Sequence, residues 1–256
     1  MRQGDALGVM PREGQSRGYG EGESGRCRRC ARIATGRSFG VSDHTQVDAR
    51  VCQTLERFST IHVLVNNAAI LGPVVPLWET EVLSWVHTLH VNLIGTYLCC
   101  RAVLPVMLQQ NQGKIVNVTS GARVRGSAAF VRCHQAAYFS SKAGITQLTE
   151  LLSHQLSGKN IQVNAMSPGG STRMLEGLLD DAKNIGDTEL VESAQRVIAA
   201  DPRERSAELA VFLASDASGT LSCRVISYAD DFHTLSSRIQ SIMASDAYTL
   251  RRVELE

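Results

Sequence analysis

Two stretches, 114-KIVNVTS-120 and 161-IQVNAMS-167, together with the helical pattern from 135 to 156 between them, decide the fold class. Both stretches are short apolar runs without strict alternation, which is typical of strands in a parallel sheet that is covered on both faces. Parallel neighbours need a crossover connection, and the intervening helix supplies one. These residues therefore predict a strand, helix and strand unit of an α/β protein.

The same alternation continues on both sides of this unit. Pro105 is expected to kink or divide the second of the predicted helices near its end. Residues 169–200 form a polar segment with weak helical periodicity, and the helix after it is expected to have a Ser206 cap and a Gly219 stop. The further predicted elements are a helix over 43–58, a strand over 61–67, a helix over 80–110, a helix over 206–219 and a strand over 224–228. We predict a doubly wound parallel sheet, Rossmann-like in type.

Composition excludes several classes of protein. The chain has 256 residues, 43% of them hydrophobic, and 26 basic against 25 acidic side chains give a net charge of +1. No polyelectrolyte surface for nucleic acid is expected at this balance, and no apolar run suggests a membrane span. Seven cysteines, an odd number, are typical of free thiols in a reducing compartment. We expect a cytoplasmic protein without nucleic-acid or membrane partners.

The first 40 residues differ from the rest of the chain. They hold nine of the 21 glycines and eight arginines but few apolar residues. Such a segment buries little surface, so we expect residues 1–40 to be an atypical Gly/Arg-rich segment. Residues 41–256 are expected to form a single domain. Cys27 and Cys30 form a CxxC without a second pair at metal spacing, so no metal site is expected.

One pair of side chains has an evident chemical use. Tyr138 and Lys142 are four residues apart in the helix predicted from 135, and therefore share a face. An ammonium beside a phenol stabilises the phenolate and so lowers the tyrosine pKa, which suits a general acid or base. Such a pair alone is more often part of a solvated face. Ser120, however, ends a strand at the sheet edge where ligands of α/β proteins bind, within reach of Tyr138.

With these residues in place, the sequence resembles the short-chain dehydrogenases/reductases of the classical type from about Val41 to Gly219. The similar segments occur in the family's order. They are LVNNAAI (64–70), HVNLIGTYL (90–98), IVNVTSGA (115–122), YFSSK (138–142) and VNAMSPGG (163–170). The resemblance implies an NAD(P)-dependent oxidoreductase that interconverts a secondary alcohol and a ketone.

The resemblance also implies a role for each catalytic residue. Tyr138 exchanges a proton with the substrate oxygen, and Ser120 hydrogen-bonds the same oxygen. Lys142 holds the nicotinamide ribose and lowers the Tyr138 pKa, while Asn92 bends its helix and holds a water of a proton relay. The cofactor surface implied for the body of the chain consists of Asn66, Asn67, Ala68, Tyr138, Lys142, Pro168 and Gly169.

The front of the chain departs from the family pattern. Gly14, Gly18 and Gly20 have the spacing of the family's phosphate-binding turn, although a Gly-rich segment can match by coincidence. About twenty family positions are absent after Arg37, so the first βαβ unit is expected to be degenerate or shortened. If this segment binds a dinucleotide, Arg17 and Arg37 would meet a 2′-phosphate and favour NADP over NAD.

Two functions remain open at this level. The first is the active oxidoreductase, acting on a small-molecule alcohol or ketone that the sequence does not name. The second is a catalytically impaired relative that serves as a dimeric interaction or structural protein. Either would form a homodimer or homotetramer through helices 80–110 and 135–156. The insertion at 124–136 and the segment 169–200 are expected to set substrate choice.

Overall fold

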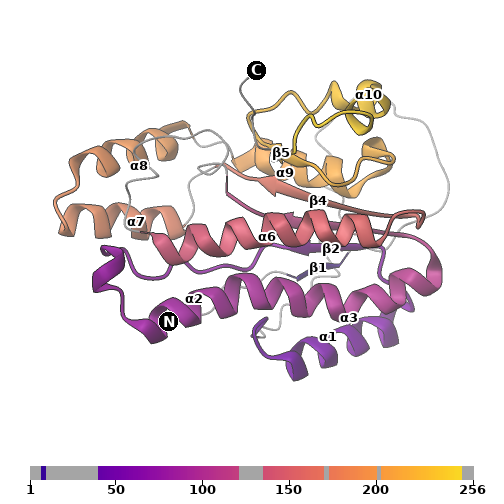
Figure 1. The fold of residues 1–256 in the computed structure, drawn as a ribbon, viewed down its shortest axis with the longest axis horizontal. Helices are drawn as coiled ribbons and strands as arrows, with labels where there is room; N and C mark the ends of the chain where they lie inside the picture. Colours follow the sequence, from indigo (N-terminus) through magenta and orange to yellow (C-terminus); the bar gives the residue numbers. More distant parts are fainter. Residues whose placement is uncertain (1–6, 10–39, 121–134, 170–172, 201–202, 250–256) are drawn as a thin grey trace, which may run out of the picture.

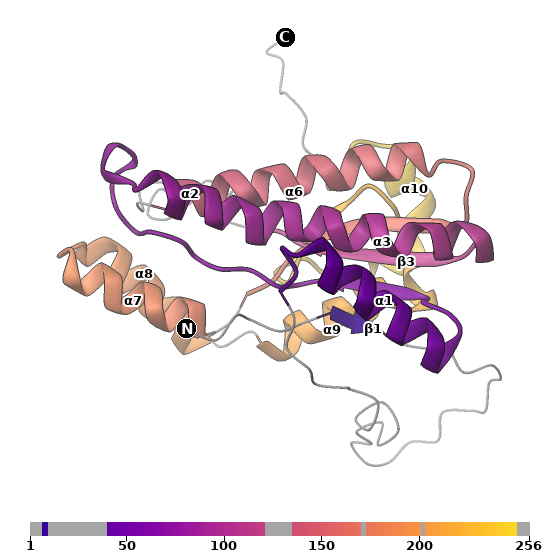
Figure 2. The ribbon, with the colours of Figure 1, turned by 90° about the horizontal axis from the view of Figure 1, so that it is seen from below.

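The computed structural model describes residues 7–9, 40–120, 135–169, 173–200 and 203–249. A central sheet lies between two layers of helices, as Figures 1 and 2 show. The strands are β1 (Leu7–Val9), β2 (Val63–Asn66), β3 (Gly113–Val118), β4 (Ile161–Ser167) and β5 (Val225–Ser227). The helices are α1 (His44–Phe58), α2 (Val82–Leu89), α3 (Gly95–Gln110), α6 (Ala136–Gln155), α7 (Arg173–Asn184), α8 (Thr188–Ala200), α9 (Arg203–Ala214) and α10 (Ile239–Met243). The predicted α/β class is confirmed.

Strands β2 to β5 are parallel neighbours in chain order. The register pairs Val65 with Val116 and Asn117 with Ala165. Because all four strands run the same way, their carboxyl ends lie at one edge of the sheet. The predicted strands at 114–120 and 161–167 are present as β3 and β4, which pair in parallel, and α6 is the crossover between them.

Alternate residues of each strand face opposite sides, so each face has its own core. On the first face Ile115 and Val163 pack with side chains from α1, α3 and α6. On the second face Val116, Val118 and Met166 pack with α9 and the C-terminal segment. Figure 2 shows α3 and α6 on one side of the sheet and α9 on the other. The apolar character of both faces explains why these strands lack strict alternation in sequence.

The first strand differs from the expectation of a wholly parallel sheet. Among the described strands β1 lies at the edge, and it pairs with β2 in the antiparallel direction, Leu7 beside Asn66 and Val9 beside Leu64. Its last residue therefore lies at the amino edge of the sheet, opposite the carboxyl ends of β2 to β5. An edge position tolerates the short run before Pro11 better than a central one. The rest of the predicted first βαβ unit lies outside the described residues.

The helical run from Val82 to Gln110 is long and apolar enough, by length and composition, to cross a bilayer. In this fold its inner face packs in the first core through Val91, Cys99, Val103 and Met107. Pro105 lies inside α3, which continues to Gln110, so the helix is not divided at the proline. Proline has no N–H, so the carbonyl of Arg101 lacks the helical hydrogen bond that residue 105 would otherwise donate. Both residues are exposed, and water can donate to that carbonyl instead.

Two further predictions about the second half of the chain are corrected. The polar segment 169–200 contains two well-formed helices, α7 and α8, which lie at one end of the molecule in Figure 1. A small core between them and the body includes Val74, Leu178, Ala182 and Leu190. Ser206 is not a helix cap, because α9 already begins at Arg203. Gly219 does end the following turn, with a φ of +46°.

The loop after β2 contains a glycine that its surroundings require. Gly72 has a φ of +75°, and a Cβ added there would collide with the side chain of the buried Thr88. Substituting alanine at Gly72 should lower the free energy of unfolding by about 2 kcal/mol. Gly186 is the matched control, since its φ is +72° but a Cβ there meets nothing within 4 Å. Urea denaturation of both variants checks this; equal losses would contradict the clash with Thr88.

Candidate active site

The candidate site lies at the carboxyl edge of the parallel strands, where the sequence predicted it. Asn66 ends β2, Ser120 follows β3 by two residues, and Pro168 and Gly169 follow β4 directly. The first turns of α6 bring Tyr138 to the same edge. Segments that are far apart in the chain therefore meet because four strands end together.

Tyr138 and Ser120 are in direct contact through their hydroxyl groups, which form a hydrogen bond. Lys142 is one turn further along α6, with Nζ 5.6 Å from the centre of the Tyr138 ring. These three residues are brought together as predicted. The geometry presents a phenol and a serine hydroxyl to one small volume, with an ammonium behind the phenol.

Burial shifts the pKa values of both ionisable groups. It raises the pKa of the Tyr138 phenol to about 12, against the opposing effect of the Ser120 hydrogen bond. It lowers the pKa of the Lys142 ammonium to about 8. The net shift of the Tyr138 pKa is upward because desolvation of the phenolate is its largest cause, whereas the effect expected of Lys142 is downward. At neutral pH Tyr138 is protonated.

The Lys142 ammonium lies inside the protein, where the described residues offer it one hydrogen-bond acceptor. Its residue is 2% exposed, and Nζ donates to the Val118 carbonyl at 2.7 Å. An ammonium has three protons to donate, and within the described ranges no carboxylate pairs with Lys142. A buried charge with unfilled hydrogen-bonding capacity is costly unless a ligand completes it. Two hydroxyl groups of a bound ribose fit this need.

The Lys142 shift predicts a pH dependence of stability. Lysine titrates near 10.5 in the unfolded chain and near 8 in the folded one, so the unfolded state binds more protons between these values. The free energy of unfolding should therefore rise with pH from 8 to 10.5, by up to about 3 kcal/mol relative to Lys142→Met. Urea denaturation of both proteins across this range measures the difference, and parallel curves would contradict the shift.

Asn92 is fully buried and fastens two segments together. Its Oδ1 accepts from the Ile70 N–H at 2.8 Å, and its Nδ2 donates to the Ile70 carbonyl at 3.0 Å and to Ser141 Oγ at 3.0 Å. The surrounding turn, His90–Ile94, is π-helical. A wide turn of this kind is frequent at functional sites. The helix therefore has a π-helical turn at Asn92, and the Asn92 amide holds the loop after β2.

Ser141 is a site residue that the sequence reasoning missed. It is fully buried, receives the Asn92 hydrogen bond, and donates to the Tyr138 carbonyl at 2.6 Å. It therefore links Asn92 to the turn of α6 that carries Tyr138. The signal in the sequence is slight, because serine next to Lys142 in a helix is common.

Asn66 is directed into the protein rather than toward a ligand. Its Nδ2 donates to Asn117 Oδ1 at 2.8 Å, and Asn117 Nδ2 donates to Thr149 Oγ1 at 2.9 Å. This buried network joins β2, β3 and α6 behind the site. Any cofactor contact at Asn66 is thus left to its backbone, whereas Asn67 is exposed and Ala68 half-buried. The sequence does hold a sign of this network, because Asn117 lies inside an apolar strand and a buried side-chain amide needs hydrogen-bond partners.

The turn after β4 is held by α9. Gly169 N–H donates to Ser206 Oγ at 2.9 Å, and the Ser206 hydroxyl donates to the Gly169 carbonyl at 2.7 Å. Pro168 and Gly169 are thereby fixed beside the strand ends. The predicted residues Gly14, Arg17, Gly18, Gly20 and Arg37 lie outside the described residues. So does most of the insertion at 124–136.

Comparison with known proteins agrees with the site. The family described as short chain dehydrogenase matches residues 24–183. The 3-oxoacyl-[acyl-carrier-protein] reductase of Synechocystis sp. is 34% identical over 170 residues, which are 63% of this chain and 66% of that protein. The chain spans between about half and two thirds of the length of the first curated relatives that it matches.

Two solved structures share the fold. NAD⁺-bound xylitol dehydrogenase has a TM-score of 0.63 and 28% identity over 73% of this chain and 75% of that one. Gluconate 5-dehydrogenase from Burkholderia cenocepacia, in complex with NADP and tartrate, has a TM-score of 0.62 and 27% identity over 74% and 71%. The family match covers more than half of the chain, and the predicted motifs meet at one edge of the sheet. This chain belongs to the short-chain dehydrogenase/reductase family.

Proposed function

We propose that this protein is an NAD(P)-dependent oxidoreductase that interconverts a secondary alcohol and a ketone. The observation that carries the proposal is the hydrogen bond between the Tyr138 and Ser120 hydroxyl groups, with Lys142 one turn behind. These groups converge on one small volume at the carboxyl edge of the sheet.

In the reducing direction the proton donor is Tyr138. With a pKa of about 12 it holds its proton at neutral pH and can pass it to a carbonyl oxygen that becomes an alkoxide. Ser120 donates a hydrogen bond to the same oxygen and stabilises its developing charge. A nicotinamide cofactor, when bound, would supply the hydride chemistry that the side chains lack. In the oxidising direction Tyr138 must first lose its proton, and Lys142 is placed to stabilise the phenolate.

The body of the site fits a dinucleotide. The buried Lys142 ammonium has donors left for ribose hydroxyls, and the fixed Pro168–Gly169 turn borders the same edge. The relatives include proteins solved with NAD⁺ and with NADP. We propose a preference for NADP, for which Arg17 and Arg37 supply the sequence argument. The ratio of turnover with NADPH to turnover with NADH tests it, and a clear preference for NADH would remove it.

The substrate is proposed only as a class, a small-molecule ketone or its secondary alcohol. By their names, the matched relatives act on 3-oxoacyl-[acyl-carrier-protein], xylitol and gluconate, and compounds of these kinds and their ketones make up the test panel. The experiment is steady-state oxidation of NADPH and NADH with a panel of these ketones at fixed enzyme concentration. Turnover that depends on both ketone and cofactor supports the proposal; its absence across the panel would count against it.

A second candidate function has one observation in its favour. Because β1 is antiparallel, its end lies at the amino edge, away from the catalytic side chains. A phosphate-binding turn that follows directly from β1 would therefore start from the wrong edge. This arrangement favours a catalytically impaired relative that acts as a dimeric interaction or structural protein. Cofactor binding separates the two functions.

We also propose a cytoplasmic homodimer or homotetramer that forms through the predicted helices 80–110 and 135–156. Large apolar side chains are exposed on both, namely Val82, Leu83, Val86, Ile94, Tyr97 and Leu108 on the first and Leu151 on the second. Exposed apolar area of this kind is typical of protein interfaces. Sedimentation equilibrium measures the oligomeric state, and a monomer at micromolar concentration would contradict this proposal.

A further inference from the structure

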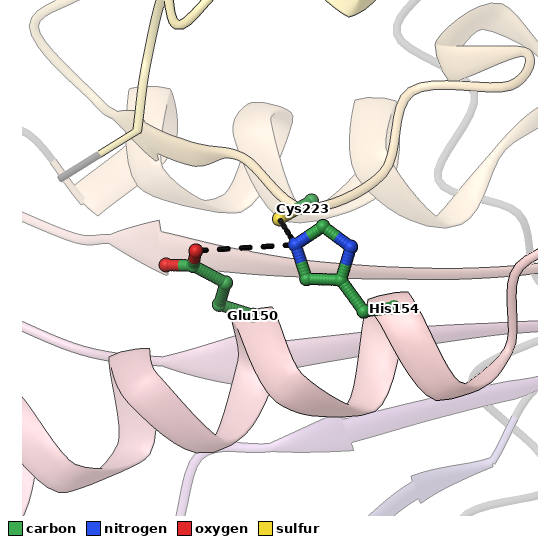
Figure 3. Close-up of side chains that lie close together, drawn as sticks. All are labelled: Glu150, His154 and Cys223. Atoms are coloured by element: carbon green, nitrogen blue, oxygen red, sulfur yellow. Dashed lines mark hydrogen bonds and ion pairs between the residues drawn. The ribbon is translucent and has the colours of Figure 1, made fainter. Parts of the chain in front are cut away.

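We propose that Glu150, His154 and Cys223 form a zinc site that fastens the end of α6 to the loop before β5. Figure 3 shows the three side chains turned toward one another across these two segments. Their ligand atoms all lie within 4.8 Å of one another. The sequence alone predicts no metal site, because Cys27 and Cys30 lack a second pair at metal spacing.

The geometry is close to that of a coordinated ion. His154 Nε2 lies 3.9 Å from Glu150 Oε1 and 4.0 Å from Cys223 Sγ. Zinc bonds of ordinary length in a tetrahedral site would separate such donors by about 3.3–3.6 Å. Side-chain rotations that move the donors by on the order of 1 Å would therefore complete the site. Glu150 and His154 are four apart on one helix face, so α6 already presents two ligands together.

The backbone of the third ligand is fixed. Cys223 has a φ of +63°, its N–H donates to the Val163 carbonyl at 2.8 Å, and the Arg224 guanidinium donates to its carbonyl at 3.1 Å. Beside it, the Ser222 and Ser153 hydroxyl groups hydrogen-bond at 2.8 Å, which ties this loop directly to α6. These hydrogen bonds hold the Cys223 side chain beside the last turns of α6.

The ligand types select zinc among common cations. A thiolate and an imidazole suit Zn²⁺, whereas Mg²⁺ and Ca²⁺ prefer oxygen ligands. A thiolate and a carboxylate together neutralise a divalent ion, and a water can occupy the fourth position. The buried thiols of Cys99 and Cys100 offer a contrast, because burial raises the pKa of each to about 12 and disfavours the thiolate.

The site is separate from the catalytic one. His154 is sixteen positions after Tyr138 on the same helix, a separation of about 24 Å along the axis. A metal bound there would cross-link α6 to the chain that follows Cys223. That chain contains β5 and the C-terminal segment of the second core. Its expected effect is on the stability of that segment rather than on the chemistry at Tyr138.

The test is isothermal titration of the full chain, freed of metal by EDTA dialysis, with ZnCl₂. We expect one equivalent to bind, and Cys223→Ser, His154→Gln and Glu150→Gln each to weaken binding by more than about tenfold. The Co²⁺-loaded protein should show a thiolate-to-cobalt charge-transfer band that Cys223→Ser removes. His154 is 67% exposed, so His154→Gln should fold normally and keeps the test valid if another variant does not.

Two matched controls identify the site. Cys52→Ser removes an exposed thiol on α1, and Cys27→Ser with Cys30→Ser removes the CxxC. Both should keep the zinc affinity and the cobalt band. Hydrogen exchange of residues 221–245 should slow with Zn²⁺ in the parent protein but not in His154→Gln. Unchanged affinity in Cys223→Ser, or loss of binding only with Cys27 and Cys30, would overturn the proposal.

Discussion

Tyr138→Phe is expected to lower turnover by about 10²- to 10⁴-fold while cofactor affinity changes by less than about threefold. The substitution removes the hydroxyl that meets Ser120 but keeps the ring, which is half-buried and stacks edge-on against Phe139 at 5.5 Å. Lys142 and its bond to the Val118 carbonyl are untouched. Steady-state kinetics with a ketone substrate and calorimetric titration of the cofactor measure the two quantities.

Tyr97→Phe is the matched control for this experiment. Tyr97 lies on α3 and is 47% exposed, and phenylalanine keeps its apolar ring, so removing its hydroxyl should leave turnover unchanged. Substantial activity in Tyr138→Phe would mean that another group transfers the proton. If cofactor affinity fell as much as turnover, the Tyr138 hydroxyl would contribute to cofactor binding rather than to proton transfer.

Asn92→Leu is expected to lower the free energy of unfolding by about 3 kcal/mol and to lower turnover as well. The variant leaves the part-buried Ile70 N–H and carbonyl without their side-chain partner, and a fully buried unsatisfied group costs about 1–3 kcal/mol. The loop that carries Asn67 and Ala68 would then lose its connection to the helix. Urea denaturation gives the stability, and kinetics on the folded protein give the activity.

Ser141→Ala separates the two contributions of Asn92. It removes only the 3.0 Å bond from Asn92 and the serine's own bond to the Tyr138 carbonyl. We expect a smaller stability loss, of about 1 kcal/mol, because the Ile70 backbone keeps its partners. If Ser141→Ala were as destabilising as Asn92→Leu, the connection to Ile70 would not be the main role of Asn92.

The sequence was sufficient for the parts of the fold that depend on local pattern. Strands β3 and β4 and helix α6 were predicted nearly to their ends, because apolar runs and helical periodicity both report burial directly. The convergence of Ser120 and Tyr138 was predictable too, since parallel strands end at one edge. The first inference depends only on residues close together in the chain, and the second on a general rule of parallel-sheet topology.

The parts that were not predicted depend on contacts between distant segments. The direction of β1 is set by its pairing with β2. The hydroxyl of Ser206 bonds to Gly169, which is distant in the chain, so the local sequence indicates a helix cap instead. Burial raises the Tyr138 pKa, and the extent of that burial depends on segments that are distant in the chain. The approach of Cys223 to His154 likewise appears only in the folded chain.

Isothermal titration with NADP(H) and NAD(H) tests the central claim most directly. If the chain is an active oxidoreductase, at least one dinucleotide binds with a micromolar to submillimolar Kd, and Lys142→Met weakens that binding because the buried ammonium no longer meets the ribose. If neither dinucleotide binds at millimolar concentration, the chain is not an NAD(P)-dependent oxidoreductase, and the catalytically impaired relative is the correct description.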